Sequence, residues 1–191
     1  PSHKIIEMGI TVLKRLMHRG AVGSDPDTGD GAGILLALPD EFFRLVLPNK
    51  LPARGKYGVA MMFGGCGHEE ELEAAVTENG GSVIAWRQVP VDRDSIGKNA
   101  QRTCPLIRQL FIDGSGFADQ AEFERKLFVM RREMERRVEG CYVCSCSSRS
   151  IVYKGLFLGT QIEGFYGDLA SEHFKSPLAL VHQRYSTNTF P

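Results

Sequence analysis

The feature that most constrains the fold is the short interval between two apolar segments in the C-terminal third of the chain. Residues 141–146 and 150–156 each have the composition of a strand, and only Ser147, Ser148 and Arg149 separate them. A parallel connection needs a dozen or more residues, usually a helix, whereas a few polar residues suffice for an antiparallel hairpin. The two segments therefore predict a hairpin and disfavour a regular, doubly wound parallel sheet.

Apolar residues elsewhere follow either a helical or a strand period. The longest helical stripe runs from Phe123 to Val138, with charged residues at the positions between. The full pattern predicts helices at residues 3–19, 40–47, 69–78 and 123–138, and further strands at 34–38, 57–63, 82–91, 106–112 and 178–181. This order indicates an α+β fold in which stacked antiparallel sheets are covered by helical layers.

Composition and charge limit the class of protein. The 191 residues contain 23 Lys and Arg against 23 Asp and Glu, so no net charge favours nucleic acid or an anionic membrane as a partner. No apolar run approaches the roughly 20 residues that span a bilayer. Five cysteines, an odd number, argue against a disulfide scaffold and for a reducing compartment. We expect residues 1–191 to form a single domain, which is an incomplete part of a longer protein.

The last predicted strand leads into one arginine, Arg184. Small hydroxyl and amide side chains follow it, from Ser186 to Thr189. A guanidinium offers five donors in a fixed fork that suits a carboxylate. We expect a buried strand here, and its position before the small polar residues favours a ligand-binding arginine over a surface one. His182, two residues earlier, is expected to be a packed, hydrogen-bonded histidine.

The segment from Asp25 to Gly33 is rich in aspartate and glycine. It does not match a calcium-binding EF-hand loop, because the twelfth position is Leu36 where a glutamate is required. It does not match a dinucleotide fingerprint either, because its glycines precede a strand instead of linking a strand to a helix. Two interpretations remain open: a tight turn that feeds a buried strand, or a loop at the border of an active site, with Arg19 at its near end.

Three closely spaced cysteines, Cys141, Cys144 and Cys146, raise the question of a metal site. In a regular strand Cys144 and Cys146 share a face and Cys141 points to the other. No second pair lies at ligand spacing, so buried, unreactive thiols are favoured and no metal is expected. A metal-binding module built on these cysteines is the alternative.

Three segments together resemble the glutaminase domain of the glutamate synthase large subunit, a class II glutamine amidotransferase. The resemblance runs over nearly the whole chain, and 148–155 and 40–43 also fit that family. The segments that carry it are Leu16-Met-His-Arg-Gly-Ala21, Gly29-Asp-Gly-Ala-Gly-Ile34 and Val181-His-Gln-Arg-Tyr-Ser-Thr-Asn-Thr189.

The resemblance implies an N-terminal-nucleophile hydrolase fold, with two stacked antiparallel sheets between helical layers. It implies that L-glutamine is hydrolysed by an N-terminal cysteine and that the ammonia is used for reductive amination of 2-oxoglutarate to L-glutamate. The parent protein is expected to use FMN, an iron–sulfur cluster and either NADPH or ferredoxin as donor, none of them bound by this chain. The remaining domains of the same large subunit and a small reductase subunit are the implied partners.

The resemblance also assigns roles to individual residues. Arg184 matches the arginine that binds the α-carboxylate of glutamine, and Tyr185, Thr187 and Asn188 match residues that line the same pocket. Arg19, Asp30 and Gly31 are placed in its neighbourhood as residues that shape the active site.

The sequence also departs from the family. No cysteine stands at its first position and no Asn-Gly oxyanion element follows Arg184, so we expect no glutaminase activity from the chain alone. A non-catalytic regulatory domain that binds glutamine or glutamate is the alternative function. Cysteine usage and charge are consistent with a bacterial cytoplasm or a plastid.

Overall fold

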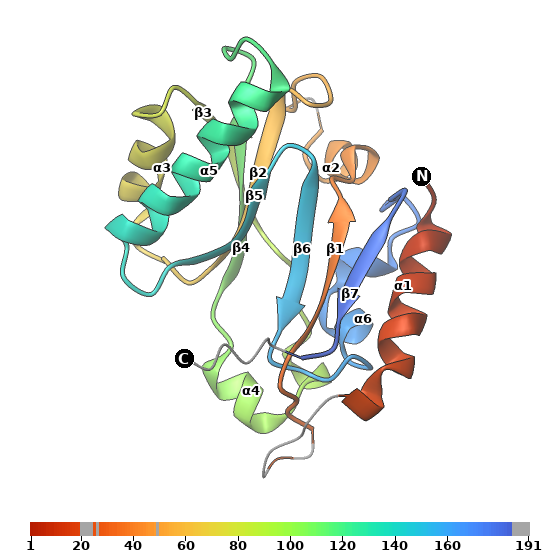
Figure 1. Ribbon diagram of the computed structural model, residues 1–191. Helices are drawn as coiled ribbons and strands as arrows, with labels where there is room; N and C mark the ends of the chain where they lie inside the picture. The colour runs from red at the N-terminus through yellow and green to blue at the C-terminus, as the bar shows by residue number, and fades with distance from the viewer. Residues whose placement is uncertain (20–24, 26, 49, 185–191) are drawn as a thin grey trace, which may run out of the picture. The chain divides into compact units, whose positions relative to one another are not determined.

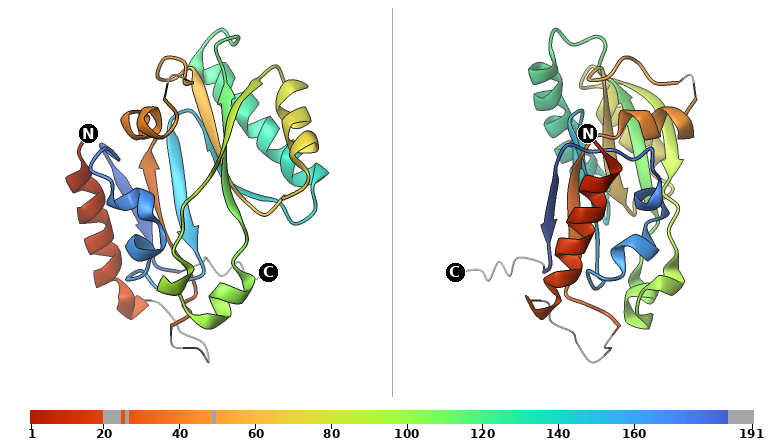
Figure 2. Two further views of the ribbon diagram at one scale, coloured as in Figure 1. Left: turned by 180° about the vertical axis from the view of Figure 1, so that it is seen from behind. Right: turned by 90° about the vertical axis from the view of Figure 1, so that its right-hand side faces the viewer.

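The computed structural model describes residues 1–19, 25, 27–48 and 50–184 (Figures 1 and 2). They form two antiparallel sheets with helices, of strand order β6-β1-β7 and β3-β4-β2-β5. The chain divides into two compact units, each built from separate stretches of sequence. The first contains residues 1–36, 90–104 and 153–191, and the second contains residues 37–89 and 105–152.

The second unit is built on the four-stranded sheet. Its strands are β2 (Tyr57–Phe63), β3 (Ser82–Gln88), β4 (Ile107–Asp113) and β5 (Tyr142–Ser147). The predicted run 57–63 coincides with β2, which is buried along nearly its whole length between β4 and β5. A continuous apolar run is what a strand covered on both faces requires.

Two helices, α3 (Glu69–Thr77) and α5 (Gln120–Arg137), pack on one face of this sheet. The predicted stripe of α5 is confirmed, because Phe123, Leu127, Met130 and Met134 are the buried residues of this helix. The shared core consists of Ala60, Met62, Leu72, Ala75, Val76, Leu110, Ile112, Phe123, Leu127, Met130, Met134, Val138, Cys141 and Val143.

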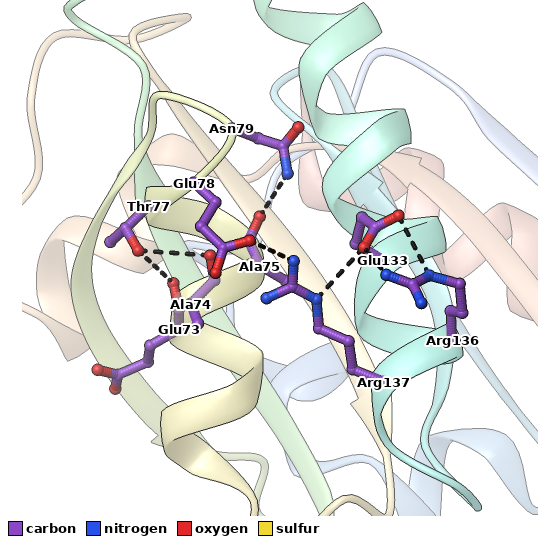
Figure 3. Close-up of polar contacts among 9 residues, drawn as sticks. All are labelled: Glu73, Ala74, Ala75, Thr77, Glu78, Asn79, Glu133, Arg136 and Arg137. Atoms are coloured by element: carbon purple, nitrogen blue, oxygen red, sulfur yellow. Dashed lines mark hydrogen bonds and ion pairs between the residues drawn. The ribbon is translucent and has the colours of Figure 1, made fainter.

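Charged side chains join the outer faces of these two helices (Figure 3). Arg137 Nε lies 3.3 Å from Glu133 within α5, and its other end forms an ion pair with Glu78 at the end of α3. Arg136 Nη2 lies 2.6 Å from the same Glu133. The charged side chains of α5 therefore form a solvent-exposed face with several ion pairs, as their helical spacing predicts.

The opposite face of the same sheet is covered by α2 (Asp40–Val46). The ring of Phe43 meets that of Phe111 edge to face, with 5.0 Å between centroids. Pro39 holds the N-cap position of this helix, and Asp40 is its first residue. The Asp40 carboxylate accepts hydrogen bonds from Arg44 Nε (2.9 Å) and from Tyr57 Oη (2.9 Å).

The three-stranded sheet consists of β1 (Ala32–Ala37), β6 (Ser150–Gly155) and β7 (Ala179–His182). Nearly all of β1, the second half of β6 and the whole of β7 belong to the first unit. Helix α1 (His3–Arg15) runs alongside β7 (Figures 1 and 2), and the turn η1 (Met17–Arg19) follows it. The short helices of this unit are η2 (Arg93–Ser95), α4 (Lys98–Thr103), α6 (Ile162–Phe165) and η3 (Gly167–Ala170). No helix among the described residues has the length and apolarity needed to cross a membrane.

A close approach at Gly33 holds the register between β1 and β7. Gly33 is the direct partner of His182 in this antiparallel ladder. A Cβ at Gly33 would lie 2.3 Å from His182 Cε1 and 2.7 Å from Lys154 Cβ. Only glycine fits at this position, because the side chains of both neighbouring strands lie over it.

The prediction that the last strand is buried is wrong. β7 is an edge strand of its sheet, and Leu180 is 66% exposed. Its other face packs on α1, where a Cβ added to Gly9 would lie 2.8 Å from Ala179 Cβ. An apolar run of this length cannot distinguish a strand covered on both faces from one covered on a single face.

The predicted hairpin is also wrong, because β5 and β6 belong to different sheets. Glu124 on α5 accepts hydrogen bonds from Ser148 N (2.6 Å) and Ser147 Oγ (2.9 Å), which hold the connection on the helix. Val152 N donates to Ser145 Oγ (3.1 Å). Arg149 O accepts from Leu38 N (2.8 Å), which directs β6 alongside β1.

We predict that Glu124→Gln lowers the free energy of unfolding by about 1–3 kcal/mol, because charge-assisted hydrogen bonds to the buried Ser148 are replaced by weaker ones. Urea unfolding measures this change. Glu139→Gln, at an exposed position after α5, is the matched control and should stay within about 0.5 kcal/mol of the native protein. Equal effects of the two substitutions would show that Glu124 does not anchor the connection.

Gly33→Ala should lower the free energy of unfolding by about 1–3 kcal/mol, because the added methyl group forces His182 and Lys154 to move. Thermal or urea unfolding tests this. Gly167→Ala is the control in the same unit, since a Cβ there meets nothing within 4 Å. A Gly33→Ala protein as stable as this control would contradict the close approach of the two strands.

Candidate functional site

The end of β7 brings together the three sequence segments that were singled out. Met17 in η1 lies against β7, with its Sδ 3.6 Å from Gln183 Nε2. Gly33 pairs with His182 in the sheet. Asp30 and Arg184, which flank this pair at the same end of the ladder, form an ion pair in which Asp30 Oδ2 lies 3.3 Å from Arg184 Nε. Two residues predicted separately for the site are therefore in contact.

The ion pair leaves the arginine accessible to a ligand. The side chains of Arg184 and Asp30 are 55% and 36% exposed, and a pair this exposed contributes about 0–1 kcal/mol. The contact is made at Nε, on the side edge of the guanidinium, whereas the two terminal nitrogens form a second edge that can bind a carboxylate with two parallel bonds. The weak pair can therefore orient Arg184 without competing strongly with an incoming carboxylate.

A hollow of about 440 Å³ lies beside this arginine, lined by Leu16, Val181, His182, Gln183 and Arg184. Its volume suits a small ligand. Among the described residues, the lining combines one cation, two further polar side chains and two apolar ones. An amino acid with a free carboxylate has the size and the charge that this lining can accept.

His182 is a packed residue, as predicted. It is half-buried, and its ring lies over Gly33. Burial, followed by the nearby charge of Lys154, lowers the pKa of His182 below its ordinary value. The imidazole is therefore neutral at neutral pH and adds no positive charge to the hollow.

Sequence reasoning missed Gln183. Its side chain is buried, and its Oε1 has no hydrogen-bond partner among the residues that the structure describes. It lies against Gly159, where a Cβ would be 2.2 Å from that oxygen. No sequence signal reveals this environment, because it depends on the packing of Gly159 and Met17, which are distant in the chain, around the end of β7.

The aspartate- and glycine-rich loop combines the two interpretations left open for it. Asp25 caps a local turn, accepting hydrogen bonds from Asp27 N (3.1 Å) and Thr28 Oγ1 (2.7 Å). Gly31, with φ of 117°, adopts a backbone conformation that favours glycine. The turn feeds β1, and it also carries Asp30 to the side of Arg184. The loop is thus both a tight turn and the border of the candidate site.

For four other predicted site residues, the structure describes either no atoms or the backbone alone. Tyr185, Thr187 and Asn188 lie outside the described residues. Arg19 is described through its backbone, as the last residue of η1. Their roles stay predictions.

The three closely spaced cysteines lie in the second unit. The predicted arrangement of faces is wrong: Cys141 and Cys146 pack on the same core, and Cys144 Sγ contacts Val152 O at 3.4 Å. The register against β2 skips Cys144, and a bulge of this kind reverses the alternation of faces. Burial, followed by a nearby glutamate, raises the pKa of Cys141 to about 11 and of Cys146 to about 12. Across the described residues, no group of three or more His, Cys, Asp or Glu side chains is arranged to hold a metal ion.

Comparison with known proteins gives the family. The sequence model described as "Glutamine amidotransferases class-II" matches residues 1–191. The chain is 46% identical to the glutamate synthase [NADPH] large chain of Bacillus subtilis and 40% identical to that of Azospirillum brasilense, over 100% of its own length and 13% and 14% of theirs. It is 34% identical to the chloroplastic/mitochondrial ferredoxin-dependent glutamate synthase 1 of Arabidopsis thaliana, over 100% of the chain and 13% of that protein. The chain belongs to the class II glutamine amidotransferases, and its two antiparallel sheets with helices are the α+β fold of that family.

Proposed function

We propose that this chain is the substrate-recognising part of the glutaminase domain of a glutamate synthase. In this proposal the protein releases ammonia from L-glutamine and uses it to convert 2-oxoglutarate into L-glutamate. The relatives named above are glutamate synthases, of which the chain covers about an eighth. The observation that carries the proposal is the Arg184–Asp30 contact beside a hollow of amino-acid size.

Arg184 is proposed to bind the α-carboxylate of glutamine. Its guanidinium is always charged and stands at the rim of the hollow, so it can form two parallel charge-assisted bonds with a carboxylate. Tyr185, Thr187 and Asn188 are proposed to line the same pocket, and Arg19 to lie near the reacting amide. These four assignments rest on the resemblance of their segments to the family.

The nucleophile is proposed to be an N-terminal cysteine that none of the five cysteines of this chain represents. Cys141 and Cys146 are buried thiols with raised pKa values, and the protonated form of a thiol is a poor nucleophile. We therefore propose that the chain alone does not hydrolyse glutamine.

The redox groups of the parent protein are assigned to its other domains. The described residues do not fit an iron–sulfur cluster, because they contain no group of three or more candidate ligands. FMN, the cluster and NADPH or ferredoxin, together with a small reductase subunit, are proposed for the complete enzyme. A bacterial cytoplasm or a plastid is its proposed location.

Arg184→Ala in the full-length protein should raise KM for glutamine about 10- to 100-fold, the loss expected for a pair of charge-assisted bonds. Glutamate formation from free ammonia should be unchanged, because it does not use the carboxylate pocket. Arg184→Lys should also raise KM, since an ammonium group cannot form the paired fork.

Steady-state assays with glutamine and with ammonium chloride as alternative nitrogen donors measure both effects. Arg15→Ala removes an exposed arginine from α1 of the same unit and should leave both activities unchanged. Equal loss of the two activities in Arg184→Ala would contradict the proposed role. Glutamine binding that depends on Arg184, in a full-length protein without any glutaminase activity, would instead support a regulatory domain that senses glutamine or glutamate.

A further inference from the structure

Asp25 stands at the centre of a set of hydrogen bonds that joins the loop to a distant helix. Its Oδ2 accepts from Thr28 Oγ1 (2.7 Å) and from the backbone N–H of Asn99 (3.1 Å), which lies 74 positions later. Asn99 is in the first turn of α4, where the amides have no partner inside the helix. The carboxylate therefore holds the loop and the start of α4 together.

Further contacts hold the residues that follow Asp25. Asp27 O accepts from Gly97 N (3.1 Å) and from Gln161 Nε2 (3.0 Å). There is no space between the loop and α4, because a Cβ at Gly97 would lie 2.4 Å from Thr28 Oγ1. Residues 27 and 28 are thus fixed against two other segments of the same unit.

Asp30, the next acidic residue, is held differently. Its side chain is 36% exposed and contacts Arg184 in a pair too weak to determine the path of the loop. Its position is set by the backbone on either side: residues 27 and 28, which are anchored through Asp25, and Gly31, which turns into β1. Movement of the Asp25 anchor would therefore move Asp30 relative to Arg184.

We propose that Asp25 is a positioning residue for the carboxylate-binding arginine: it fixes the loop on α4, so that Asp30 stays beside Nε of Arg184 and orients the guanidinium toward the ligand. The inference rests on the proposed function of Arg184. The hydrogen bond from Asn99 N, followed by that from Thr28 Oγ1, lowers the pKa of Asp25 below its ordinary value. Asp25 is consequently ionised at neutral pH, as an acceptor of three hydrogen bonds needs to be.

A double-mutant cycle in the full-length protein tests the proposal. Asp25→Asn keeps the size of the side chain but replaces one acceptor oxygen by a donor that faces other donors. We expect it to raise KM for glutamine about five-fold, the change that corresponds to losing one capping interaction, and to leave kcat within about two-fold. Asp30→Asn should also raise KM, and the double variant should match Asp30→Asn alone, because Asp25 acts through Asp30.

Two further variants control for effects on folding. Thr28→Val removes only the hydroxyl that bridges Asp25 and Ala100 N and should change KM in the same direction by a smaller factor. Asp92→Asn is the matched control, because Asp92 caps η2 in the same unit through Asp94 N (3.0 Å) and Ser95 Oγ (3.0 Å). It should leave KM unchanged even where the melting temperature falls.

A second measurement does not require glutamine turnover. The rate at which phenylglyoxal modifies Arg184, followed by peptide mass spectrometry, should rise in Asp25→Asn and in Asp30→Asn, and no further in the double variant. Three results would overturn the inference. The effects of Asp25→Asn and Asp30→Asn on the labelling rate could multiply in the double variant, Asp30→Asn could lower KM, or Asp25→Asn could behave like Asp92→Asn. If the native protein does not use glutamine, the proposed function fails, and the labelling rates alone decide the role of Asp25.

Discussion

The antiparallel pairing of β1 with β7 is the constraint on which the candidate site depends. Gly33 opposite His182 sets the register, and the ring over Gly33 leaves no space for another residue there. Asp30 precedes β1 and Arg184 follows β7, so both emerge from the same end of the ladder. A slip by one residue would shift them by about 3.3 Å, as far as the 3.3 Å that separates their charged atoms. The register of β1 against β7 therefore determines how close the charged groups of Asp30 and Arg184 lie.

Much of the fold could be predicted because burial follows the period of each element. The apolar stripe from Phe123 to Val138 and the run from Tyr57 to Phe63 correspond to α5 and β2. Helix α4 was not predicted, because its residues are mostly polar and it depends on distant partners such as Asp25. The predicted hairpin was wrong for a similar reason: Glu124, on another element, holds the connection between β5 and β6. Local patterns do not contain such long-range contacts.

The sequence was enough to predict which residues belong to the candidate site, but not which of them are in contact. Arg184 was singled out because an isolated arginine before small polar residues suits a carboxylate, and Asp30 because its loop resembles a family segment. Their contact could not be predicted, since it depends on which strands pair and on how β7 lies at the edge of its sheet. The buried amide of Gln183 had no signal at all. The sequence thus identified Arg184 and Asp30 as candidates, and the pairing of β1 with β7 places them in contact.

Carboxylate recognition by Arg184 is tested most directly by changing the ligand as well as the protein. L-Glutamine and its α-amide, which lacks the free carboxylate, can be compared by calorimetric titration of the full-length native protein and of Arg184→Ala. We predict that the native protein binds glutamine at least about ten-fold more tightly than the α-amide, which corresponds to the loss of a charge-assisted bond, and that Arg184→Ala binds both equally. An Arg184→Ala protein that keeps the full preference for the free carboxylate would show that another group recognises it.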